Sequence, residues 1–129
     1  IWIRSSDYEN ANLMILLSFV LLGHPDWRKS GIRIFEVYKP DQFSSLQKGI
    51  EELIQKGRLP ITKSNLEWIE EDPNVPFRDL VQEKSNDAGL TLIGFNMQKV
   101  KHDGGKALRG YETNSNILFI NSHKQIEID

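Results

Sequence analysis

Two kinds of apolar pattern alternate along the chain, namely short β-branched or aromatic runs and stripes at helical spacing. The runs of the first kind cover residues 1–4, 32–38, 66–69, 90–95 and 117–121. Runs of this length and composition, bounded by polar residues, glycine or proline, are typical of buried strands. The pattern therefore predicts five strands.

The longest apolar segment of the chain predicts a helix over residues 11–22. It is apolar nearly all round, which is typical of a helix buried on several sides, and we expect Leu16 or Leu17 in the core. Gly23 is a natural helix end, and Pro25 prevents its continuation. Ten apolar residues of helix span only about 15 Å, half of a hydrocarbon core, so the segment is not expected to cross a membrane.

Two further helices are predicted between the later strands. One opens at Pro40 and ends at Gly57, with a single stripe formed by Phe43, Leu46, Ile50, Leu53 and Ile54. The other starts near Pro76 and turns inward Phe77, Leu80 and Val81. A short helix is also expected near residues 107–111.

Because strands and helices alternate, the chain is predicted to be one α/β domain over residues 1–129. We expect three layers around a mostly parallel five-stranded sheet, with right-handed crossovers and a flavodoxin-like or universal-stress-protein-like fold. The expected strand order is 2-1-3-4-5 or a close relative of it.

Charge and composition narrow the classes of function. The 16 basic and 18 acidic residues are mixed, with no Lys/Arg run longer than two, which argues against a nucleic-acid partner. Cysteine is absent, so disulfides and thiolate metal sites are excluded, in keeping with a reducing compartment. The chain opens in mid-strand at Ile1 without Met or a signal peptide, and we expect it to be part of a larger protein.

Ligands of open parallel sheets bind beyond the carboxyl ends of the strands. The residues that follow the predicted strands define a candidate strand-end pocket of Ser5, Asp7, Gly94, Asn96 and Ser122. A phospho-receiver domain has carboxylates after its first and third strands, which hold Mg²⁺, and a Lys after its fifth strand. Asp7, the acids of residues 70–72 and Lys124 occupy these positions here. A receiver has paired acids directly after its first strand, whereas here Ser5 and Ser6 come first, so ordinary loop acids and helix caps are the preferred interpretation.

No other pattern indicates chemistry. The first strand-to-helix turn has no glycine, so neither a dinucleotide fingerprint nor a P-loop is present, and we expect no meaningful affinity for ATP. Gly104-Gly105 is interpreted as a flexible connection. The histidines His24, His102 and His123 occupy three separate loops, which does not favour a metal site. We therefore expect no catalytic residue, no cofactor and no metal.

The order of several segments resembles a known family. Ile1-Trp2-Ile3, the leucine-rich residues 12–17, Trp27-Arg28 and the Ile-Arg-Ile-Phe of residues 32–35 follow one another closely. This succession resembles the C-terminal cytoplasmic region of cation–chloride cotransporters, the Na-K-Cl and K-Cl symporters. Residues 78–85 with residues 88–90 resemble a later helix and a strand of that region, and residues 116–120 with His123 resemble its last strand and the Asn-His turn that follows. The resemblance is weakest over residues 39–63.

Two departures from the family pattern indicate a distant, prokaryotic relative. Glu9-Asn10-Ala11 stands where the family often has Asp-Gly-Gly, and Phe95-Asn96 where it has Leu-Pro. The resemblance implies a regulatory, dimerising tail of a symporter, folded like a universal stress protein domain and lying at the cytoplasmic face of the plasma membrane. Its partners would be its own transporter membrane domain and a second copy, with no membrane insertion of its own. A universal-stress-like nucleotide-binding module and a degenerate phospho-receiver are the alternatives.

Overall fold

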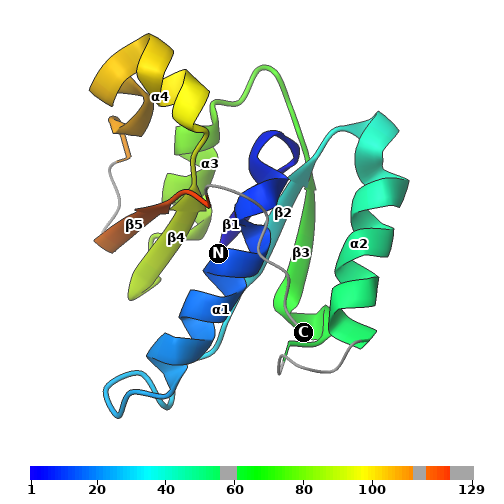
Figure 1. The fold of residues 1–129 in the computed structure, drawn as a ribbon, viewed down its shortest axis with the longest axis vertical. Coiled ribbons are helices and arrows are strands. Elements are labelled where there is room, and N and C mark those ends of the chain that lie inside the picture. The colour runs from blue at the N-terminus through cyan, green and yellow to red at the C-terminus, as the bar shows by residue number, and fades with distance from the viewer. Residues whose placement is uncertain (56–60, 112–115, 123–129) are drawn as a thin grey trace.

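The computed structural model describes residues 1–55, 61–111 and 116–122; for residues 5–7, 53 and 107 it describes the backbone alone. The strands are β1 Trp2–Arg4, β2 Ile34–Tyr38, β3 Leu66–Glu70, β4 Leu90–Gly94 and β5 Asn116–Ile120. The helices are α1 Ala11–Leu22, α2 Phe43–Gln55, α3 Phe77–Lys84 and α4 Met97–Asp103. Strand and helix alternate as predicted, so the α/β class is confirmed (Figure 1).

The five strands form one sheet in the order β3-β2-β1-β4-β5, and every neighbouring pair is parallel. The doubly wound, flavodoxin-like topology is thus present, but the order 2-1-3-4-5 is wrong. The composition of β3 explains the difference, because Glu67 and Glu70 are exposed there and charged residues suit a strand at the edge of a sheet. In β1, by contrast, Trp2 and Ile3 are almost completely buried, as a central strand requires.

Each face of the sheet has its own apolar core, which confirms the three layers. On the face covered by α1 and α2, the cluster contains Ile3, Met14, Ile15, Ile34 and Leu92, with Ile54 of α2 packed against it. On the opposite face, Val81 of α3 packs with Trp2, Phe35, Val37 and Ile93. The Trp2 and Phe35 rings stack there with centroids 4.4 Å apart.

Helix α1 has the predicted bounds but not the predicted burial. Its buried residues are Ala11, Met14, Ile15 and Ser18. Of the two residues expected in the core, Leu16 is 38% exposed, whereas Leu17 is half-buried and packs against the core cluster without being one of its buried members. The reason is geometric: α1 packs on one face of the sheet, and only one of its stripes turns inward.

The segment after β4 also differs from expectation. The sequence pattern does not predict helix α4, because Val100 is its only partly buried residue and the segment has no apolar stripe. A side-chain cap starts it instead, since the backbone N–H of Gln98 donates to Asn96 Oδ1 over 2.8 Å. Near the short helix expected around residues 107–111, the chain forms a 3-10 turn over Gly104–Leu108. Within the described ranges, no helix is long and apolar enough to cross a membrane.

Candidate functional site

A pocket of about 560 Å³ lies at the carboxyl edge of the sheet, beside β1 and β4. These two strands are neighbours in the sheet although they are far apart in sequence, so the strand order reverses between them. In open parallel sheets this switch point is where ligands bind. The pocket is lined by Arg4, Pro76, Phe77, Arg78, Phe95, Asn96, Gln98, Lys99, Val100 and Tyr111.

The lining of this pocket is basic and aromatic. It contains Arg4, Arg78 and Lys99, and none of the described lining residues is acidic. The guanidinium of Arg4 lies 4.2 Å from the centre of the Phe77 ring and donates to the Gly94 carbonyl over 2.9 Å. Both contacts fix the charge at the end of β1. The positive lining would favour an anionic ligand.

Arg78 is held in a similar way on the other wall. It donates to the Lys106 carbonyl over 2.8 Å, and its guanidinium lies 5.6 Å from the centre of the Tyr111 ring. Gly110 makes room for this side chain, since a Cβ at that position would lie 2.9 Å from Arg78 Cδ. Gly110 also has a φ of +86°, a conformation that glycine adopts at little cost. The backbone of residue 110 thus positions Arg78 against the pocket.

Two of the residues predicted for a strand-end pocket, Gly94 and Ser122, have other roles in the structure. Buried Asn10 accepts the backbone N–H of Ser122 at 2.7 Å and donates to the Phe95 carbonyl at 3.1 Å. Gly94 lies so close to Asn10 that a Cβ would come within 2.9 Å of Asn10 Nδ2. Gly94 and Ser122 are therefore brought together, but around a filled polar junction that ties β4 and β5 to the start of α1. Among the predicted residues whose side chains the structure describes, Asn96 alone lines the pocket.

The side chains of the other residues predicted for the strand-end pocket fall outside what the structure describes. Ser5 and Asp7 belong to a 3-10 turn over Ser5–Asn10, and their side chains lie outside what the structure describes. His123 and Lys124 also lie outside the described residues. No group of three or more His, Cys, Asp or Glu residues that could hold a metal occurs among those described.

The observed strand order removes the geometry that a phospho-receiver needs. The acids Glu70, Glu71 and Asp72 follow β3, which pairs with β2 only. Strand β2 therefore lies between them and the residues that follow β1. In the order 2-1-3-4-5 the two sets would be neighbours.

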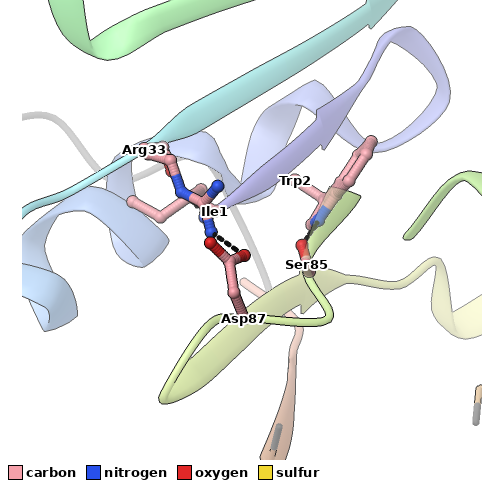
Figure 2. Close-up of polar contacts among 5 residues, drawn as sticks. All are labelled: Ile1, Trp2, Arg33, Ser85 and Asp87. Carbon is pink, nitrogen blue, oxygen red and sulfur yellow. Dashed lines mark hydrogen bonds and ion pairs between the residues drawn. The ribbon is translucent and has the colours of Figure 1, made fainter. Parts of the chain in front are cut away.

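A second pocket, of about 520 Å³, lies at the opposite edge of the sheet, near the beginnings of β1, β2 and β4. Figure 2 shows that Ser85 and Asp87, which follow α3, face Trp2 and Arg33 across this region. Trp2 Nε1 donates to Ser85 Oγ over 2.8 Å, and Arg33 forms a 2.8 Å ion pair with Asp87. The hydrogen bond from Arg33, together with its charge, lowers the pKa of the exposed Asp87 carboxyl. These contacts connect the loop between α3 and β4 to β1 and β2.

A buried acid lies on the α1 and α2 face of the sheet. Glu36 is completely buried in β2 and points to the same face as Ile34. Burial raises the pKa of the Tyr8 hydroxyl, and the negative charges of Glu36 and Glu52 raise it further. Gly49 of α2 lies directly against this hydroxyl, since a Cβ there would lie 2.9 Å from the Tyr8 oxygen. This region is thus a polar packing contact between the sheet and α2.

Sequence reasoning missed the basic pocket because its residues come from four separate segments. Arg4 ends a strand, Arg78 lies in α3, and Lys99 lies in a helix that has no apolar pattern. Only the strand order brings them to one edge. Comparison of the chain with protein-family models, with curated proteins and with solved structures finds no match.

Proposed function

We propose that this chain is the regulatory and dimerisation domain of a secondary-active cation–chloride symporter, without catalysis of its own. It would act at the cytoplasmic face of the plasma membrane, as the soluble tail of an integral membrane protein. Its partners would be its own transporter membrane domain and a second copy of the chain. The ordered resemblance at both ends of the sequence supports this proposal.

The segments that resemble the symporter tail are structurally central. They include most of β1, the first half of α1 and the start of β2, and then most of α3, the first residue of β4 and all of β5. Together these elements include the middle of the sheet and helices on both of its faces. The resemblance implies a parallel α/β domain, and the observed five-stranded parallel sheet agrees with that at the level of fold class. Its weakest part, residues 39–63, includes α2 and the approach to the edge strand β3.

One structural observation favours association over chemistry: α1 keeps an apolar outer face. Leu16 is 38% exposed and Val20 is 68% exposed, in a helix that contains no charged residue. Surface helices of globular domains normally present polar residues to water on that side. An apolar, uncharged outer face is suited to binding another protein surface.

Reconstitution of the intact and the tail-deleted transporter tests the proposal. Deletion of this domain is expected to alter assembly or the regulation of flux, and to leave unchanged which cations and anions are moved. The comparison measures transport of each ion by the two proteins in the same vesicles. A changed ion preference would place a selectivity determinant in this domain and contradict the regulatory role.

The basic pocket favours a second candidate function, a universal-stress-like module that binds a nucleotide. Arg4, Arg78 and Lys99 would face its phosphates. The lack of a glycine-rich turn after β1 counts against it, because such a turn supplies the backbone N–H groups that bind phosphate. Calorimetric titration with ATP separates the candidates. Micromolar binding that is lost in Arg78→Ala would rank the nucleotide module first, whereas absence of binding supports the association domain.

A further inference from the structure

Helix α1 has two apolar stripes on opposite sides. The inward stripe is the buried set Ala11, Met14, Ile15 and Ser18. A helix advances by about 100° per residue, so the same spacings recur on the far side of α1. There they form a second set, here called the outer stripe, which consists of Leu13, Leu16, Leu17 and Val20. Its flanks, Leu13 and Leu17, are half-buried against the core, and its centre, Leu16 and Val20, is exposed.

No polar residue interrupts the outer stripe. Within α1 only Asn12 and Ser18 are polar, and the hydroxyl of buried Ser18 donates to the Met14 carbonyl over 2.9 Å. A helix that is apolar all round is normally covered on all sides. The described residues of the chain cover α1 on one side, which indicates that the outer stripe contacts another surface.

A further exposed apolar residue lies on the same side of the sheet as α1. Leu118 of β5 lies opposite Leu92 of β4, so the two side chains project from the same face. Leu92 belongs to the core cluster under α1, which places Leu118, 43% exposed, on the α1 side. Five large apolar residues are exposed among those described, and three of them, Leu16, Val20 and Leu118, share this face. The other two, Val75 and Met97, lie apart, in the loop before α3 and in α4.

We propose that two copies of this chain pair through the outer stripe, with α1 antiparallel to α1 about a two-fold axis. This inference rests on the proposed dimerisation function and assigns its surface. A two-fold interface is made by the same patch on both subunits, so the patch must be complementary to itself. The outer stripe meets that condition, because it is apolar and has no charges that would repel their own copies.

The charges at the two ends of α1 favour the antiparallel arrangement. Exposed Glu9 precedes the helix, and exposed Arg28 and Lys29 follow it, accompanied by Asp26. Antiparallel pairing places Glu9 of one copy near the net basic end of the other, whereas parallel pairing would place Glu9 next to itself. The helix dipoles also favour the antiparallel arrangement, because they then run in opposite directions and attract one another.

The size of the surface sets the expected strength of pairing. A helix of 12 residues is about 18 Å long. A pair of such helices with the β5 flank buries less than the roughly 1,200–2,000 Å² of a stable interface. The isolated chain is therefore expected to pair weakly and in a concentration-dependent way, and more strongly when two tails are held close together in one transporter.

The absence of cysteine from the chain makes a direct test possible. In Leu16→Cys the new thiols would lie near the proposed axis, because Leu16 is exposed and lies next to the middle of the 12-residue helix, and mild oxidation should join two copies by a disulfide. Val75→Cys is the matched control, because Val75 is also exposed but lies outside the stripe. Faster cross-linking of the Leu16 variant at equal concentration is the expected result, and equal or slower cross-linking overturns pairing through the outer stripe. Val20→Cys should cross-link more slowly than Leu16→Cys, because Val20 lies away from the middle of the helix, and equally fast cross-linking of the two overturns the antiparallel arrangement.

Sedimentation of the 129-residue chain over a range of concentrations gives the second measurement. Val20→Glu should weaken self-association about tenfold or more, because a charge would be buried without a partner, while Val75→Glu should leave it unchanged. Both sites are exposed in the single copy, so both variants are expected to fold, as circular dichroism can verify.

The possible outcomes separate this inference from the proposed function. A dimer that survives Val20→Glu overturns the outer stripe as the interface and leaves dimerisation itself intact. A wild-type chain that stays monomeric at every concentration overturns pairing through α1, while the reconstitution experiment still decides the regulatory role. Binding of the wild-type chain to phosphatidylcholine vesicles that is lost in Val20→Glu, without self-association, would assign the stripe to a lipid surface and also overturn the proposal.

Discussion

Neighbouring residues of α1 should respond very differently to the same truncation. Ile15 is completely buried in the core cluster beneath the helix, whereas Leu16 is 38% exposed on the opposite side. Replacing a fully buried Ile by Ala removes its transfer free energy and leaves a cavity, at a cost of about 2–5 kcal/mol. At Leu16, water already reaches the side chain and can fill the space left, so Leu16→Ala should cost at most about 1–2 kcal/mol.

Urea unfolding followed by tryptophan fluorescence measures both free energies. The two substitutions occupy the same helix and end in the same residue, so changes in helix propensity largely cancel. Dilute protein keeps the comparison free of self-association. Equal losses at the two positions, or a larger loss at Leu16, would contradict the assignment of the inner and outer faces of α1.

Helix α1 illustrates what the sequence can predict and what it cannot. Its apolar content and the stop at Gly23 and Pro25 locate both ends of the helix correctly. Because the helix is apolar on all sides, however, its sequence does not indicate which stripe faces the sheet. The sheet decides that, because its face accepts only the stripe of Ala11, Met14, Ile15 and Ser18.

Strand order depends on small differences in burial that propensity does not measure. All five strands look alike as apolar runs, and alternation of strand and helix is compatible with several orders. The distinguishing signal was the pair of acids in β3, Glu67 and Glu70, which marks an edge strand. An edge position for β3 excludes 2-1-3-4-5, because that order places strand three between strands one and four.

The candidate site depended on this same order. The predicted residues Gly94 and Ser122 do lie at strand ends, but Asn10, which directly precedes α1, fills the space between them. The basic pocket also lies at the carboxyl ends of the strands, but on the face of the sheet that α3 covers. No local sequence pattern marks its arginines. Only the three-dimensional arrangement brings them together.

Two further predictions concern buried polar groups. Asn10→Ala should destabilise the chain by about 1–3 kcal/mol, because the Ser122 N–H loses its acceptor in a buried setting; chemical denaturation measures this, and an unchanged stability would show that the polar junction is not needed. Tyr8→Phe should change the response to alkali. The pKa of Tyr8 is raised above 10.0 by burial and by nearby acids, so the folded chain holds this proton more tightly than the unfolded chain does. Its contribution to stability is therefore fully present below pH 10 and is lost as the pH rises through the raised pKa. Unfolding free energies measured from neutral to alkaline pH should fall less steeply in Tyr8→Phe than in the wild type, with Tyr38→Phe as the control. A decline that is the same in all three proteins would show that Tyr8 is not shielded by the sheet and α2.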